Sequence, residues 1–294
     1  MKLGSTRNLQ LLDRIAMAAC VAATMVSVGA LLTGCSEQGQ QRAERAQENW
    51  DGQAALQKHD YPKAIEAFTH LIEQNPKRGE YYVGRAQAYM GVSDYDKATA
   101  DCKKAEEFKL QVSGLLGKIE LCQGHAAEAA EQFRKKLDSA PETPNLEDAV
   151  YCALAYKLAD KDAEAEKIAA RAMANYAKDS YVMAHKNDDN AQKYVWEKWP
   201  YPALQYLRGQ IDGGKMVATT ADSEWDLPEA HCVSGMNLVA KAPKDAADKT
   251  TPDDGPTDTA AAVKELNFVI EHSTPDRFIN QLAKSQLARM QSGH

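Results

Sequence analysis

The stretch Asp60–Pro76, DYPKAIEAFTHLIEQNP, decides the fold. Ala64 and Phe68 lie four residues apart in it, so both side chains share one face of a predicted helix. The pair Asn75–Pro76 ends that helix, because proline cannot continue it. Thirty-four residues further on, the sequence DYDKA of Asp94–Ala98 matches the opening DYPKA. A self-match at this period predicts a repeat architecture.

Four units of this kind follow one another, each with a small residue on a first helix and an alanine twelve residues later on a second helix. Antiparallel helices joined by a short turn approach closely where side chains are small, and each pair leaves an apolar face for the next pair to cover. We therefore predict an all-α helix-turn-helix solenoid over residues 45–182. The pairs are Gly52 and Ala64, Ala86 and Ala98, Gly117 and Ala129, and Ala153 and Ala165.

These units resemble the tetratricopeptide repeat (TPR). Tyr89 and Tyr156 fill one first-helix position, and Pro76 and Pro141 close two second helices, although the usual tryptophan of the motif is missing from all four units. The resemblance implies that the first helices line a concave groove for an extended or helical segment of a partner protein. The groove positions that it implies are Asn49, Gln53, Leu56, Val83, Gln87, Met90, Lys118, Leu121, Val150 and Leu154.

The N-terminal residues 1–34 have the pattern of an export signal. Ile15–Leu32 is uncharged and follows three basic residues, and Leu32-Thr33-Gly34-Cys35 resembles the bacterial lipobox. The resemblance implies cleavage before Cys35 and acylation of its thiol. An uncleaved membrane-spanning helix is the alternative, but it would not need the small-residue cleavage site. We expect residues 35–44 to form a lipidated tether to a membrane surface.

The charge balance narrows the class of partner. Residues 1–34 hold three basic residues and one acidic residue, so the 35 basic and 42 acidic residues of the chain fall to 32 and 41, a formal net charge of −9. A surface of that sign repels nucleic acid. We therefore expect protein partners and no nucleic acid.

The residues that could carry chemistry are scattered. There is no HExxH, GxSxG or phosphate-binding glycine loop, and no cysteine or histidine cluster has metal-ligand spacing, so we expect no catalysis, no cofactor and no metal. The adjacent pair His231–Cys232 lies in an apolar helical pattern that is typical of a core. Buried free thiols are the favoured interpretation of the remaining cysteines, with disulfide pairing left open: Cys102, Cys122, Cys152 and Cys232.

Residues 183–294 predict a C-terminal helical module. A fifth repeat, with Gly235 opposite Ala262, carries a polar, proline-rich insertion between its two helices. A last amphipathic helix is expected to cover the open end of the repeat stack. The predicted helices are 189–199, 203–211, 227–242, 257–272 and 276–290.

The order of these parts is similar to that of the NlpI-type TPR lipoproteins, including the phrase Tyr206-Leu207-Arg208-Gly209. That resemblance implies a homodimeric adaptor for peptidoglycan hydrolases and envelope proteases. It implies a place on the periplasmic side of the outer membrane, or on the outer face of the cell membrane if the source has one membrane. The alternative function is an assembly factor or pilotin for an outer-membrane or pilus machine.

Overall fold

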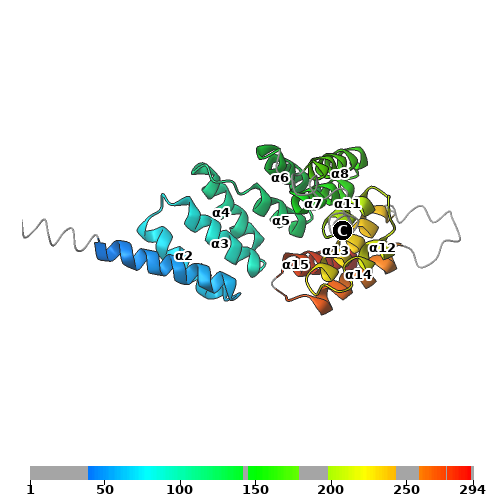
Figure 1. Ribbon diagram of the computed structural model, residues 1–294. Coiled ribbons are helices and arrows are strands. Elements are labelled where there is room, and N and C mark those ends of the chain that lie inside the picture. The colour runs from blue at the N-terminus through cyan, green and yellow to red at the C-terminus, as the bar shows by residue number, and fades with distance from the viewer. Residues whose placement is uncertain (1–38, 142–144, 179–197, 243–257, 276, 293–294) are drawn as a thin grey trace, which may run out of the picture.

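The computed structural model describes residues 39–141, 145–178, 198–242, 258–275 and 277–292 (Figure 1). The expected signal and Cys35 lie outside these ranges, as do most of the expected helix at 189–199 and most of the insertion. Within the described residues every regular element is a helix. A first helix at residues 39–57 precedes α2 (Tyr61–Gln74), α3 (Gly79–Gly91), α4 (Tyr95–Glu107), α5 (Ser113–Gln123), α6 (Ala126–Ser139), α7 (Leu146–Leu158), α8 (Asp162–Ala177), α11 (Tyr201–Leu207), α12 (Gly213–Ala218), α13 (Asp226–Lys241), α14 (Asp258–His272) and α15 (Phe278–Ser292).

Successive helices form antiparallel pairs that stack side by side from the blue first helix to the green α8 in Figure 1. The turn within each of the four pairs contains one residue with a left-handed backbone: His59, Ser93, Gly124 and Asp160, with φ of 59°, 60°, 87° and 59°. Their separations of 34, 31 and 36 residues equal those between the small residues of the repeats. The structure therefore confirms the solenoid and the register predicted from the sequence.

In the first and third repeats, the glycine of the first helix makes room for a phenylalanine that follows the alanine by four positions. A Cβ atom added at Gly117 would lie 2.8 Å from the ring of Phe133, and one added at Gly52 would lie 3.1 Å from the ring of Phe68. Both rings are fully buried. These two repeats thus pack an aromatic ring against a glycine, whereas the second and fourth repeats have the small residues Cys102 and Ala169 at the same position.

The fifth pair, α13 and α14, forms as expected, and a Cβ at Gly235 would lie 2.9 Å from Leu266. Two features of the module differ from expectation. The helix expected at 203–211 ends at Leu207, because Gly209 turns the backbone with φ of 70°. A further short helix, α12, then begins where a turn was expected, with its first backbone N–H groups capped by Asp212, which accepts from Lys215 N at 2.7 Å.

The first helix also starts earlier than expected. Residues 39–44, which we assigned to the tether, are helical and continuous with the first repeat. Glutamine, arginine, alanine and glutamate dominate this segment, and all have high helix propensity. The expected tether is therefore helical from residue 39 onward.

Helix α15 packs on the fifth pair, as expected of a capping helix, and it also reaches back to the third repeat. It packs against α5, α13 and α14, and in Figure 1 it lies in the middle of the molecule beside α5. One hydrophobic core runs from Leu121 in α5 through α7 and α13 to Ala283 in α15. The C-terminal module consequently shares its core with the third and fourth repeats. Among the described residues no helix combines the length and apolar character needed to cross a membrane.

Candidate partner-binding groove

The ten groove positions fall into two sets that differ in exposure. Gln53 and Gln87 are exposed, and Asn49, Leu56 and Val83 are half-buried. We call these five residues the open half of the groove; they come from the first helix and α3. The other five, the covered half, are Met90, Lys118, Leu121, Val150 and Leu154, and all except the half-buried Lys118 are 8% exposed or less.

The covered half is filled by the chain itself. Helices α11 and α13 pack on α7, and α15 packs on α5. Phe278 at the start of α15 meets the ring of Tyr151 edge-on, with 5.1 Å between ring centroids. Lys118 also faces inward, with its ammonium 5.3 Å from the Phe278 ring centroid and 3.2 Å from Glu147 Oε1. In this conformation Leu121, Val150 and Leu154 are core residues, so no partner reaches them.

Polar contacts fix α15 in place along the groove. The Gln281 side chain donates to the Gly91 carbonyl oxygen at the end of α3, at 3.1 Å. Arg289 donates to the Cys122 carbonyl oxygen at the end of α5, at 2.8 Å. Carbonyl groups at helix ends lack intrahelical partners. Gln281 and Arg289 therefore donate to acceptors that α3 and α5 leave unpaired.

A half-buried acid, Glu229, lies beneath this interface. Tyr151 donates its hydroxyl to the Glu229 carboxylate on α13. Burial raises the pKa of Glu229 above its ordinary value, although the Tyr151 hydrogen bond opposes the shift. Burial also raises the pKa of the Tyr151 phenol well above its ordinary value. The hydrogen bond therefore links α7 of the fourth repeat to α13 of the C-terminal module. It requires that the Tyr151 hydroxyl keeps its proton.

At one end of the open half lies a cleft of about 460 Å³ between the first helix and the start of α3. Arg42, Arg45 and Arg78 line it, together with the Tyr81 ring and one carboxylate, Glu80. Arg45 donates to a backbone carbonyl of its own helix, at 3.0 Å. None of the three arginines forms an ion pair within the described part of the chain. An acidic protein thus presents a local cationic surface at the accessible end of its groove.

The sequence reasoning did not single out these arginines. The available signal was their spacing, since Arg45 and Arg78 lie 33 residues apart, about one repeat. Two arginines at nearly equivalent positions of successive units predict neighbouring side chains on one face of the solenoid. Arg42 lies one helical turn before Arg45 and joins the same face.

Among the candidate chemical groups, the cysteines are core residues, whereas His231 is half-buried. All four described cysteines are free and buried, as the favoured interpretation predicted. Burial raises the pKa of the Cys102, Cys122 and Cys152 thiols to about 12, and it raises the pKa of Cys232 further. His231 pairs with Glu265, at 2.6 Å. The described residues contain no group of three or more His, Cys, Asp or Glu side chains that could hold a metal ion.

Comparisons with known proteins agree with the repeats. No protein-family model matches the chain. A stretch of 90 residues is 32% identical to small glutamine-rich tetratricopeptide repeat-containing protein 2 of Saccharomyces cerevisiae, covering 30% of this chain and 26% of the relative. A stretch of 91 residues is 35% identical to the protein SGT1 homolog of Bos taurus, covering 29% of this chain and 27% of the relative. The matches thus span about a quarter of these relatives.

Among solved structures, a tetratricopeptide repeat protein from Parabacteroides merdae aligns with 83% of this chain and 84% of its own, at a TM-score of 0.45 and 14% identity. The helix pairs and their register define the fold as an all-α, TPR-like helix-turn-helix solenoid, and the matched stretches are similar to TPR sequences. Solenoids of this class use extended concave surfaces to bind other proteins.

Proposed function

We propose that the chain is a lipid-anchored scaffold that binds other cell-envelope proteins through the open half of its groove. The observation that carries this proposal is the contrast between the two halves. The covered half is closed by the chain's own helices, whereas Gln53 and Gln87 remain exposed beside Val83 and Leu56. Amides next to aliphatic side chains can hydrogen-bond a partner backbone and bury its apolar side chains.

The arginine cleft gives the open half a preference for acidic partner segments. Three guanidinium groups that form no ion pair with the described residues lie at the end of the open half, and they favour a partner segment that carries carboxylates. The rest of the protein is acidic and would repel such a segment. The acidic segment would therefore be steered toward the arginine end of the groove.

Site-specific photocrosslinking tests the groove assignment. A photoreactive amino acid at Gln87 should crosslink envelope proteins in living cells, and the same group at the exposed Gln210 in the C-terminal module serves as the control. Mass spectrometry of the adducts separates the adaptor function from the alternative. Wall hydrolases or proteases support an adaptor, and secretin, pilin or barrel components support an assembly factor. Equal adduct patterns at Gln87 and Gln210 would contradict partner binding in the open half of the groove.

The lipid anchor rests on the sequence Leu32–Cys35 and is tested separately. Replacing Cys35 with serine removes the only thiol that the lipobox pattern acylates. The Cys35→Ser protein should leave the membrane fraction and lose labelling by radioactive palmitate, because no acyl chain remains to insert in the bilayer. Retention of the label in the variant would contradict an anchor at this residue.

A further inference from the structure

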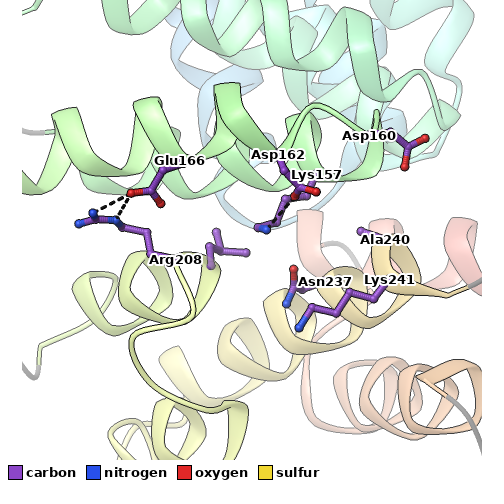
Figure 2. Close-up of a pocket in the computed structure, with 9 residues that line it drawn as sticks. Lys157, Asp160, Asp162, Glu166, Arg208, Asn237, Ala240 and Lys241 are labelled. Carbon is purple, nitrogen blue, oxygen red and sulfur yellow. Dashed lines mark hydrogen bonds and ion pairs between the residues drawn. The ribbon is translucent and has the colours of Figure 1, made fainter.

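A second cavity lies away from the groove, between the fourth repeat and the C-terminal module. It has a volume of about 440 Å³ and is enclosed by the end of α7, the start of α8, α11 and α13 (Figure 2). This volume falls within the range of small-molecule sites, about 300–1,000 Å³. Its lining is mainly polar, so it suits a charged ligand rather than an apolar one.

The cavity contains a buried acceptor without a partner. Asn237 on α13 is 1% exposed, and its Oδ1 atom has no hydrogen-bond partner within the described residues. Figure 2 shows the amide projecting from α13 into the space beneath α8. Buried polar atoms in folded proteins are normally hydrogen-bonded, so an orphaned oxygen that lines a cavity points to a donor that comes from outside the chain.

The charged side chains around Asn237 come from different helices, with carboxylates on α8 and a lysine on α13. Two ion pairs hold the upper side: Lys157 with Asp162 at 3.0 Å, and Arg208 with Glu166 at 2.7 Å (Figure 2). Lys241 lies one helical turn from Asn237 on α13 and forms no ion pair in the described part of the chain. Its ammonium lies 6.0 Å from the centroid of the Tyr206 ring. The cavity thus has two carboxylates on α8, each paired with a cation, and on α13 a cation that forms no ion pair with the described residues.

We propose that this cavity binds a small zwitterion, a free amino acid or a short peptide with both termini unblocked. The ligand ammonium would donate to Asn237 Oδ1 and lie near the Asp162 and Glu166 carboxylates. The ligand carboxylate would accept from the Lys241 ammonium. Both contacts are charge-assisted hydrogen bonds, the strong kind in a partly enclosed site. This site is independent of the partner-binding groove and does not depend on the proposed scaffold function.

Isothermal titration calorimetry with alanylalanine tests the proposal on the mature full-length protein. We expect saturable binding by about 10 mM peptide, tenfold above a Kd of about 1 mM. N-acetylation, which removes the ammonium, and C-terminal amidation, which removes the carboxylate, should each weaken binding by about tenfold or more. Absence of saturable heat, or equal binding of the blocked peptides, would overturn the proposal and leave a hydrated cavity.

Two variants assign the contacts. Lys241→Met should weaken the binding of alanylalanine by about tenfold, because the ligand carboxylate has lost its partner. The variant should then bind the peptide and its C-terminal amide equally well. Asn237→Leu should remove the preference for a free ammonium. Lys264→Met, an exposed change on α14, is the control and should bind as the natural protein does. Circular dichroism checks the fold of each variant. Unchanged binding by folded Lys241→Met would rule out the proposed orientation.

Discussion

At the scale of single residues, Gly84 is a point of very close approach between the first two repeats. A Cβ atom at this position would lie 2.4 Å from the Phe68 ring, closer than real contacts allow. We predict that Gly84→Ala lowers the free energy of unfolding, because overpacking costs about 1–3 kcal/mol and outweighs the helix-propensity gain of at most about 1 kcal/mol. Urea denaturation followed by circular dichroism measures this change.

Gly39 provides the matched control in the first helix. A Cβ there would meet no atom within 4 Å, so Gly39→Ala should leave stability unchanged or raise it by at most about 1 kcal/mol. If both alanine variants are equally stable, the tight packing at Gly84 does not limit the approach of the repeats.

The raised pKa of Glu229 predicts that the free energy of unfolding depends on pH. Burial raises its folded-state pKa, and Glu147 raises it further, while Tyr151, Arg277 and Lys118 oppose the shift. A carboxyl group with a raised folded pKa favours folding fully below its unfolded pKa, and this contribution is lost as the pH rises through the folded value. Above the ordinary pKa of glutamate, this shift therefore disfavours the folded state relative to a neutral side chain at residue 229.

Glu229→Gln isolates this effect, because the amide carbonyl can still accept from the Tyr151 hydroxyl. We expect the thermal midpoint of the variant to exceed that of the natural protein at about pH 7, and the difference to shrink toward about pH 4, near the ordinary pKa of glutamate. A difference that is the same at both pH values would show that Glu229 does not titrate with a raised pKa.

The exposure of single side chains was the least predictable property. The sequence placed Val150 and Leu154 on the groove side of a first helix, but their burial depends on α13 and α11, more than 45 residues later in the chain. The roles of Asn237 and Lys241 also arise only from this long-range packing. Local spacing reports which side of a helix a residue occupies, but not what covers that side.

At the scale of elements, α15 is held against α5 by Arg289. Its guanidinium donates to the Cys122 carbonyl oxygen, and burial lowers its pKa. Arg289→Met keeps the aliphatic stem but removes the donors, so we predict a loss of about 1–3 kcal/mol in the free energy of unfolding. Lys284→Met, an exposed change on the same helix, should cost little. Equal stability of the two variants would show that packing alone holds α15.

The existence of the repeat helices was predictable, because each carries its own period of small and large residues. The placement of α15 was not. Its apolar face, with Ile279, Leu282 and Ala283 buried, was identified correctly, but an apolar face does not specify which surface it covers. Helix α12 was missed because a six-residue segment that begins Gly213-Gly214 has low helix propensity.

At the scale of the whole molecule, burial increases from the first repeat to the fourth. In the first helix only Gly52 and Ala55 are buried among the described residues, whereas nearly every residue of α7 is buried. Hydrogen exchange measured by mass spectrometry should therefore be fastest in the first helix and slowest in α7, since local opening follows the number of buried contacts. Uniform protection along the chain would contradict a graded solenoid.

The bond from Gln281 to the Gly91 carbonyl joins residues 190 positions apart. A simple solenoid forms mainly local contacts, and its units can fold in sequence as the chain emerges. Here the second repeat stays without part of its final packing until the last helix has been synthesised. Such closure raises the contact order of the protein and should slow the completion of folding relative to an unclosed repeat array of equal length.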